Sequence, residues 1–271
     1  MARAAFRFYG PLNDFLPPAR RGRTFDATCA PDATVKHMVE ALGVPHTEIE
    51  LLLVDGQPAG FAHLLRDGER VAVYPGFESL DVGELARLRE PVPGPPRFVA
   101  DAHFGGLARL LRMAGFDTLY DNCFRDAEIE ALAARGGRIV LTRDRELLKR
   151  RGIVRGCYLR ARDSVGQLQE VFDRLGLARH ASPFSLCMEC NAALEAVDKP
   201  AVLDRLPPKV RERHQHFTFC RRCDRVLEFS APSVDPLIKQ IETEFSRQYG
   251  LQVEGASLVL YGLCQACAAE I

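Results

Sequence analysis

Three aspartates, each at or shortly after the end of a short apolar run, are the residues whose type and spacing suggest chemistry. They are Asp101, Asp126 and Asp144. The apolar runs before them are typical of buried β-strands, over residues 98–100, 118–120 and 139–142. Carboxylates gathered in one place repel one another unless a divalent cation binds between them, and Mg²⁺ or Mn²⁺ prefers such hard oxygen ligands. A metal held beside a phosphodiester promotes hydrolysis, so the pattern predicts a metal-dependent nuclease.

Amphipathic helices between the strands must position these acids. The first is expected to bury Leu107, Leu110, Leu111 and Ala114, with Arg112 off that stripe. A later helix begins at a Ser164-x-x-Gln167 capping box, and its expected buried residues are Val165, Leu168, Phe172 and Leu175. Alternating strands and helices predict a parallel sheet, because parallel neighbours need a crossover. Ligands of such sheets bind beyond the carboxyl ends of the strands, where we expect the three acids to meet.

Some acids of this region also have a purely structural interpretation. Asp126 could be an N-terminal helix cap, Asp121 is interpreted as a turn residue, and Asp163 is either a further ligand or a turn acid. Asp101 and Asp144 follow directly on apolar strands, and the sequence suggests no structural role for them.

The basic residues are concentrated beside Asp144. Residues 97–163 carry 14 Lys or Arg against 9 Asp or Glu, although the net charge of the whole chain is zero. The candidates for contacting RNA phosphates are Arg143, Arg145, Lys149 and Arg150. Such a cluster holds a phosphate backbone electrostatically, whatever the base sequence. The alternative is a solvated helix face, and the position next to Asp144 favours phosphate binding.

The composition is that of a soluble globular protein with two domains or three small ones. The chain has 271 residues, of which 47% are hydrophobic and 27% charged. The sequence contains no run of 18 consecutive apolar residues, so we expect no membrane span. The start of the chain does not resemble a signal peptide. We therefore expect a cytoplasmic protein without membrane contact, in which the nine cysteines serve as metal ligands rather than disulfides.

Two Cys-x-x-Cys pairs form a strong metal-binding signal. They are Cys187/Cys190 and Cys220/Cys223, separated by 29 residues. Two such pairs are the ligand set of a closed tetrahedral zinc site, and zinc bound there contributes folding free energy. The sequence therefore predicts a structural Zn²⁺.

The first ninety residues show two strands, a helix and further strands, which is the order of a β-grasp fold. The segments that carry a closer resemblance are "FRFYGPLNDFLPPARRGRTF", "VKHMVEALGVPHTEIELLLVDG" and "DGERVAVYPGFESLD". They resemble the ubiquitin-like domain found ahead of the Mut-seven C-terminal RNase domain. No Gly-Gly occurs near 80–96, so we expect a docking or regulatory module with a protein partner rather than a sulfur carrier. A Pro-rich linker over 91–96 follows this 1–90 domain.

The next segments resemble the Mut-seven C-terminal RNase domain itself, a member of the PIN-like nucleases. They are "RFVADAHFGGLARLLRMAGFDTLYDN", "RDAEIEALAARGGRIVLTRDRELLKRRG" and "DSVGQLQEVFDRLGL". The resemblance implies a PIN-like parallel-sheet domain over 97–180 and a zinc ribbon over 181–226. It implies that Asp101, Asp126 and Asp144 are the catalytic, metal-binding acids and that Arg143 contacts phosphate. Glu128 and Glu130 are weaker candidates.

The tail over 227–271 departs from that pattern. Its segments "EFSAPSVDPLIKQIETEF" and "YGLQVEGASLVLYGLCQACAAEI" resemble the dimerisation half of the ferric uptake regulator family. The resemblance implies a small α+β tail and a homodimer, with Cys264 and Cys267 as alternative zinc partners of Cys220/Cys223. One pair cannot fully serve two sites, and the shorter loop favours Cys187/Cys190 as its partner.

The sequence therefore predicts an α/β protein with a β-grasp domain, a PIN-like domain with a zinc ribbon, and a small tail. The favoured function is a metal-dependent ribonuclease with Mg²⁺ or Mn²⁺ and a structural Zn²⁺. The alternatives are a non-catalytic zinc-bound adaptor for RNA or protein, and a metal-responsive dimer.

Overall fold

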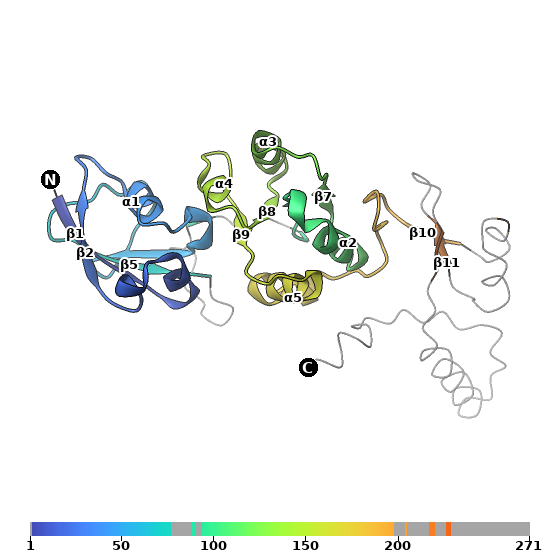
Figure 1. Cartoon of the computed structure of the whole chain (residues 1–271), viewed down its shortest axis with the longest axis horizontal. Helices are drawn as coiled ribbons and strands as arrows, with labels where there is room; N and C mark the ends of the chain where they lie inside the picture. The colour runs from blue at the N-terminus through green and yellow to red at the C-terminus, as the bar shows by residue number, and fades with distance from the viewer. Residues whose placement is uncertain are drawn as a thin grey trace, which may run out of the picture. The chain divides into compact units, whose positions relative to one another are not determined.

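The computed structural model falls into two compact units, which are described separately (Figure 1). The first comprises residues 1–111 and 116–181, and the second comprises 112–115 and 182–271. The residues that the structure describes are 2–76, 88–89, 94–197, 204, 217–219 and 226–228. Among the described helices, none is both long enough and apolar enough to cross a membrane.

The first unit opens with a five-stranded mixed sheet in the order β2-β1-β5-β3-β4. The strands are β1 (Ala2–Phe8), β2 (Phe25–Cys29), β3 (Leu51–Val54), β4 (Gln57–Pro58) and β5 (Arg70–Tyr74). β1 pairs parallel with β5, and the other pairs are antiparallel. Helix α1 (Val35–Ala41) begins after Thr34, whose hydroxyl accepts the N–H of His37, as capping requires. This is the β-grasp fold predicted from the sequence.

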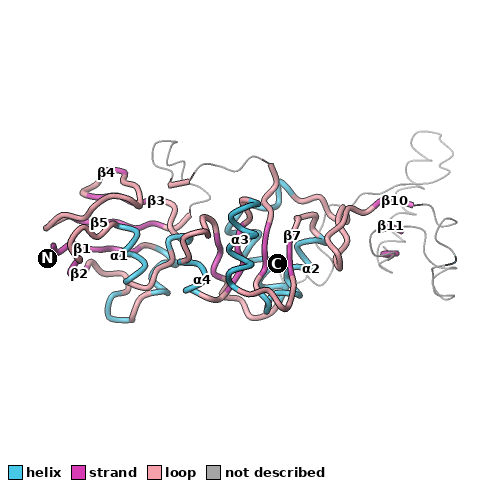
Figure 2. Tube along the Cα trace, turned by 90° about the horizontal axis from the view of Figure 1, so that it is seen from above, coloured by secondary structure: helices cyan, strands magenta, loops and turns pink. Residues whose placement is uncertain are grey.

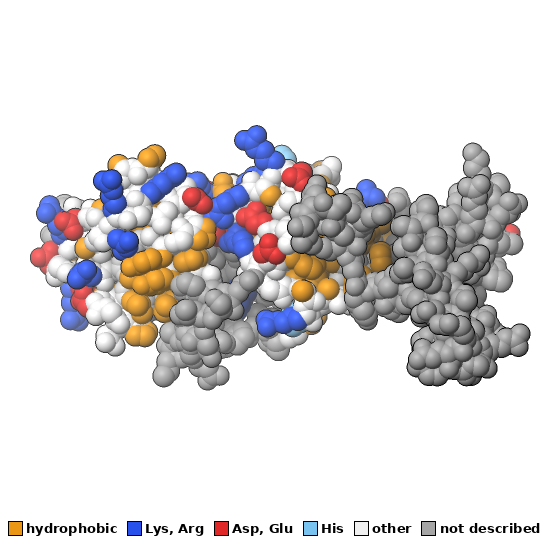
Figure 3. Space-filling view, turned by 90° about the horizontal axis from the view of Figure 1, so that it is seen from below, with side chains coloured by type: hydrophobic (Ala, Val, Ile, Leu, Met, Phe, Trp, Pro, Cys, Tyr) orange, Lys and Arg blue, Asp and Glu red, His pale blue; other side chains and the backbone are white. Residues whose placement is uncertain are grey.

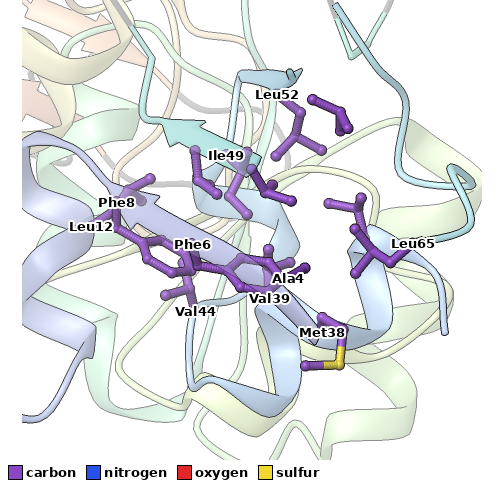
Figure 4. Close-up of a cluster of buried hydrophobic side chains, with 14 of the residues drawn as sticks. Ala4, Phe6, Phe8, Leu12, Met38, Val39, Val44, Ile49, Leu52 and Leu65 are labelled. Atoms are coloured by element: carbon purple, nitrogen blue, oxygen red, sulfur yellow. The ribbon is translucent and has the colours of Figure 1, made fainter. Parts of the chain in front are cut away.

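The core of this domain follows from the period-2 pattern of β1. Ala4, Phe6 and Phe8 are buried, whereas the residues between them are partly exposed. Figure 4 shows these side chains packed with Val39 and Leu52 from α1 and β3. Strand β3 begins only at Leu51, and Glu48 before it lies in the 3₁₀ helix η3 (His46–Glu48).

A four-stranded sheet follows, with all strands parallel and in the order β7-β6-β8-β9. The strands are β6 (Phe98–Ala100), β7 (Thr118–Tyr120), β8 (Ile139–Thr142) and β9 (Gly156–Tyr158). The first three have the predicted bounds. The helices are α2 (Gly105–Met113), α3 (Asp126–Gly136), α4 (Arg145–Lys149) and α5 (Ser164–Leu175). Figure 1 shows α3 and α4 on one side of the sheet and α5 on the other, and Figure 2 gives a second view.

The buried face of helix α5 differs from the one predicted. In α5 the buried residues are Gln167 and Val171, while Val165 is 42% exposed. The cap of α5 is Asp163, which accepts the N–H of Gly166 at 2.8 Å, and not Ser164. Ser164 is taken up by close packing against Gly106, where a Cβ atom would collide with its side chain.

The second unit contains a three-stranded antiparallel sheet in the order β10-β11-β12. Its strands are β10 (Glu195–Val197), β11 (Phe217–Phe219) and β12 (Val226–Glu228). Arg112, expected off the buried stripe of α2, is only 5% exposed and donates to the carbonyls of Met188 and Glu189 at 3.0 and 2.7 Å. The predicted dimerisation tail lies almost entirely outside the described residues and stays a prediction.

The outer edge of β9 is closed by a side chain from the β-grasp domain. Glu48, only 2% exposed, accepts the N–H of Tyr158 at 2.6 Å and forms an ion pair with Arg174 at 2.7 Å. Arg174 also donates to the carbonyl of Tyr158 at 2.8 Å. An edge strand with unpaired backbone groups can pair with other chains and cause aggregation. Here the N–H and the carbonyl of Tyr158 both have partners. His46 adds a hydrogen bond to the carbonyl of Ile153 at 2.9 Å. The two domains of the first unit are therefore joined by buried polar contacts.

Glu48→Ala should lower the free energy of unfolding by about 2–4 kcal/mol. It leaves the N–H of Tyr158 without its partner and removes the closer of the two carboxylates that pair with Arg174, the other being Glu170 at 3.4 Å. Urea denaturation of the full chain measures the change. The matched control is Glu146→Ala, since Glu146 is 79% exposed and its loss should cost no more than about 0.5 kcal/mol. Equal unfolding midpoints for Glu48→Ala and wild type would contradict the assigned contact.

Candidate functional site

The first part of the site is a hydrogen-bonded link between two strand ends. β6 and β8 are neighbours in register, with Ala100 opposite Leu141, so Asp101 and Thr142 leave the sheet side by side. The Thr142 hydroxyl donates to Oδ2 of Asp101 at 2.6 Å and accepts the N–H of Asp144 at 2.9 Å. Thr142 is fully buried. One buried hydroxyl therefore ties both acids to the carboxyl edge of the sheet.

The carboxylates of both acids also accept hydrogen bonds from backbone N–H groups. Oδ1 of Asp101 accepts the N–H of Ala102 at 2.6 Å at the start of η5 (Ala102–Phe104). Oδ1 of Asp144 accepts the N–H groups of Glu146 and Leu147 at 2.7 and 3.2 Å, which caps α4. The expectation that neither acid has a structural role is therefore wrong. Among the described residues, Oδ2 of Asp144 has no hydrogen-bond partner, and this oxygen remains able to bind a cation.

Asp126, the third predicted acid, has a different setting. It is the first residue of α3 and about half exposed, and its Oδ2 lies 3.6 Å from Nη1 of Arg150. The cap of α3 is Arg125, so the interpretation of Asp126 as the cap is wrong. Within the described ranges, no three His, Cys, Asp or Glu side chains gather as a metal site. The structure thus links Asp101 with Asp144 and shows no such link for Asp126.

All four predicted phosphate contacts have partners inside the protein. Arg143 donates to the carbonyls of Leu159, Arg160 and Ala161, which joins the ends of β8 and β9. The guanidinium of Arg145 lies over the rings of Phe15 and Tyr158. The other two form ion pairs, Lys149 with Glu146 and Arg150 with Glu130. On the face shown in Figure 3, basic side chains lie among acidic ones. These residues therefore hold the site together, and phosphate binding by them stays a prediction.

Two successive glycines allow the remaining elements to converge on this edge. A Cβ at Gly105 would meet the ring of Tyr120, and one at Gly106 would meet Ser164. Tyr120 donates from its hydroxyl to the carbonyl of Ala102 at 3.0 Å. The ends of β6 and β7 and the start of α5 are thereby brought together. At that start, the N–H of Gly166 lowers the pKa of Asp163, so its carboxylate is committed to the helix rather than displayed as a ligand.

The cysteine site is only partly within the described residues. Cys187 is buried and Cys190 is half-buried, and they flank a tight turn in which Cys187 donates to Ala192 and accepts from Asn191. In the β10–β11 ladder Glu195 lies opposite Phe219, so the chain enters β10 from this turn at the same end where it leaves β11. The predicted ligands outside the described residues are Cys220, Cys223, Cys264 and Cys267.

Comparison with known families decides the identity of the two domains. Residues 1–81 match the family described as Mut7-C ubiquitin, and residues 96–227 match the Mut7-C RNAse domain. The chain carries a Mut7-C ubiquitin domain followed by a Mut7-C RNAse domain. Together the two matches confirm the domain order predicted from the sequence, and the family indicates a nuclease.

Two solved structures are similar to part of the chain, and both are crystal structures of small archaeal modifier protein 1 from Haloferax volcanii. They are 20% and 18% identical to it, cover 28% and 29% of this chain and 100% and 99% of their own, and have TM-scores of 0.24. The search among curated proteins found no match. The matched residues of the Mut7-C RNAse domain end at 227, so the tail prediction gains no support from them.

Sequence reasoning missed two residues of the Mut7-C RNAse domain that the structure shows to matter. Thr142 is the last residue of the predicted strand 139–142, and a polar residue at a strand end gives little sign that its hydroxyl bonds to Asp101. Arg160 is one of the basic residues of 97–163, and besides Glu170 of its own domain it contacts the other domain through an ion pair with Asp14 at 3.3 Å. No local signal in the sequence could have shown this pairing across about 150 positions.

The stability contributed by Glu130 should depend on pH. The Arg150 guanidinium and the N–H of Gly152 lower the pKa of Glu130, so its charged form is favoured in the folded state. The difference in unfolding free energy between wild type and Glu130→Gln should therefore be fully present above the ordinary Glu pKa of about 4.3. It should be lost as the pH falls through the lowered pKa. Urea titrations across this range measure it, and a difference independent of pH would contradict the assignment.

Proposed function

We propose that this chain is a metal-dependent ribonuclease that hydrolyses RNA phosphodiester bonds, with Asp101 and Asp144 as its principal metal ligands. The observation that carries the proposal is the Thr142 hydroxyl, which joins both acids at the carboxyl ends of β6 and β8. This edge is where parallel sheets bind their ligands, and it lies inside the part that matches an RNAse domain.

The chemistry of the donors fits Mg²⁺ or Mn²⁺. These ions prefer carboxylate oxygens, and Mg²⁺ commonly keeps several waters while binding one or two protein carboxylates. Two acids are therefore a sufficient protein contribution. When bound, such an ion lowers the pKa of a coordinated water and offsets the negative charge that develops on the phosphate.

The protein's own residues have two tasks in this proposal. Thr142 and the N–H groups of Ala102, Glu146 and Leu147 orient the two carboxylates, which removes the entropy cost of ordering them when the ion binds. Arg143 holds the neighbouring loop by its three carbonyl contacts. Asp126 remains a proposed third ligand, and its exposed carboxylate can change partner at little cost because its contact with Arg150 is long.

RNA cleavage by the full chain with Mg²⁺ or Mn²⁺ tests the assignment. Asp101→Asn and Asp144→Asn should each lower the cleavage rate by roughly a hundredfold, which corresponds to about 3 kcal/mol of lost transition-state stabilisation. The matched control is Asp173→Asn, an exposed acid of α5 that should cleave at the wild-type rate. Asp126→Asn decides whether the third acid contributes. If Asp144→Asn cuts RNA as fast as wild type, the site is wrong.

We also propose a structural Zn²⁺ held by Cys187, Cys190, Cys220 and Cys223. The register of β10 and β11 supports this set, because the first pair precedes Glu195 and the second pair follows its partner Phe219. Arg112 supports the first pair by donating to the carbonyls of Met188 and Glu189 within the Cys-x-x-Cys turn. Thiolate pairs of this kind fit zinc better than they fit Mg²⁺.

Metal analysis of the purified full chain distinguishes the two zinc schemes. Cys187→Ser should lose most of the bound zinc and lower the thermal stability, because zinc binding contributes folding free energy. Cys264→Ser should retain zinc under the favoured scheme. Cys123→Ser, at an exposed cysteine outside the pairs, serves as the control. Zinc loss in Cys264→Ser with full retention in Cys187→Ser would show that the tail supplies the ligands instead.

A further inference from the structure

An arginine-rich turn of the ubiquitin domain has no role in the fold described so far. Residues 17–25 contain Arg20, Arg21 and Arg23 and no acidic residue. Arg21 and Arg23 are exposed, and neither forms an ion pair among the described residues. Arg20 lies over the ring of Phe25 at 4.8 Å. Three neighbouring like charges repel one another, and an anionic ligand would relieve that repulsion.

The turn is held in one conformation. Arg21 donates from Nε to the carbonyl of Leu16 at 2.9 Å, which leaves its terminal amino groups for other partners. The N–H of Gly22 donates to Oδ1 of Asn13 at 2.7 Å. The amide of Asn13 in turn donates to the carbonyls of Phe8 and Gly10, both at 3.0 Å. The turn is therefore fixed to η1 (Gly10–Phe15), and little entropy is lost when it binds a ligand.

The same η1 helix contacts the RNAse domain. Arg160 donates to the carbonyl of Pro11 at 3.1 Å, and Arg145 donates to that of Phe15 at 3.4 Å. Both guanidinium groups lie over the Phe15 ring, with centroid distances of 5.3 and 4.9 Å. Arg145 directly follows Asp144 in the chain. The arginine-rich turn is thus anchored, through one short helix, to two arginines that follow β8 and β9.

We propose that the two domains share one phosphate-binding surface, the basic band, which holds single-stranded RNA on its way to Asp101 and Asp144. The band consists of Arg20, Arg21 and Arg23 of the ubiquitin domain and Arg145 of the RNAse domain. This inference rests on the proposed function, since it names how the substrate is held. It assigns the ubiquitin domain a role in binding RNA within the same chain.

The chemistry of the band suits a phosphate backbone. An arginine that lies over an aromatic ring can keep N–H groups available for phosphate oxygens, as Arg145 does over Phe15 and Tyr158. Arg160 instead uses its guanidinium on Asp14, Glu170 and the carbonyl of Pro11. Among the described residues, no carboxylate forms an ion pair with Arg20, Arg21, Arg23 or Arg145. Contacts of this kind bind RNA without reading its sequence.

Binding of a fluorescent oligouridine to the full chain tests the band, measured by anisotropy at several salt concentrations in the Asp144→Asn background. Arg21→Gln/Arg23→Gln should weaken binding and reduce the slope of log Kd against log salt by about 1.4, or about 0.7 for each lost phosphate contact. Arg66→Gln/Arg70→Gln is the matched control, because it removes two exposed arginines at the other end of β1 and β5. It should leave the slope unchanged.

The single variant Arg23→Gln keeps the test valid if the double variant misfolds, because Arg23 makes no hydrogen bond among the described residues. It should reduce the slope by about 0.7. Equal slopes for the band variant, the control and the parent would overturn the band. The same would follow if both double variants weakened binding equally. Cleavage separates this from the proposed function. In the otherwise wild-type chain, Arg21→Gln/Arg23→Gln should raise KM and leave kcat unchanged. A wild-type chain that binds through the band and cuts no RNA would instead refute the nuclease alone.

Discussion

The hydrogen bonds of one buried hydroxyl are the constraint on which the site depends. Thr142 bonds to Asp101 across the β6–β8 pair and to the N–H of Asp144 two residues later. Strand register alone would leave the two carboxylates at one edge with free rotamers. The hydroxyl and the backbone N–H groups restrict their orientations.

The contact between the domains follows the same principle at another strand. The exposed edge of β9 is completed by Glu48 and Arg174, which bond to the backbone of Tyr158. A carboxylate that is 2% exposed cannot give up its partners cheaply, so the ubiquitin domain is a fixed part of the RNAse domain's surface. The contacts of η1 with Arg145 and Arg160 add to this attachment. The role of the ubiquitin domain as a docking or regulatory module with a protein partner stays a prediction.

Much of the fold could be predicted because it depends on local pattern. The strands at 98–100, 118–120 and 139–142 follow from apolar runs bounded by turns, and the ends of parallel strands must share an edge. The parts that could not be predicted depend on tertiary contacts. Arg143 reaches three carbonyls of another loop, and Ser164 packs on Gly106 while Asp163 caps α5. The burial of Arg112 likewise requires the Cys187–Cys190 turn, which lies far away in sequence.

The most direct test of the central claim is the anomalous scattering of Mn²⁺ in crystals of the full chain. We expect a Mn²⁺ ion coordinated by the carboxylates of both Asp101 and Asp144, and no ion at that edge in Thr142→Val crystals grown under the same conditions. Mn²⁺ bound only elsewhere, or carboxylates of residues 101 and 144 that ligate no ion at saturating Mn²⁺, would contradict the account.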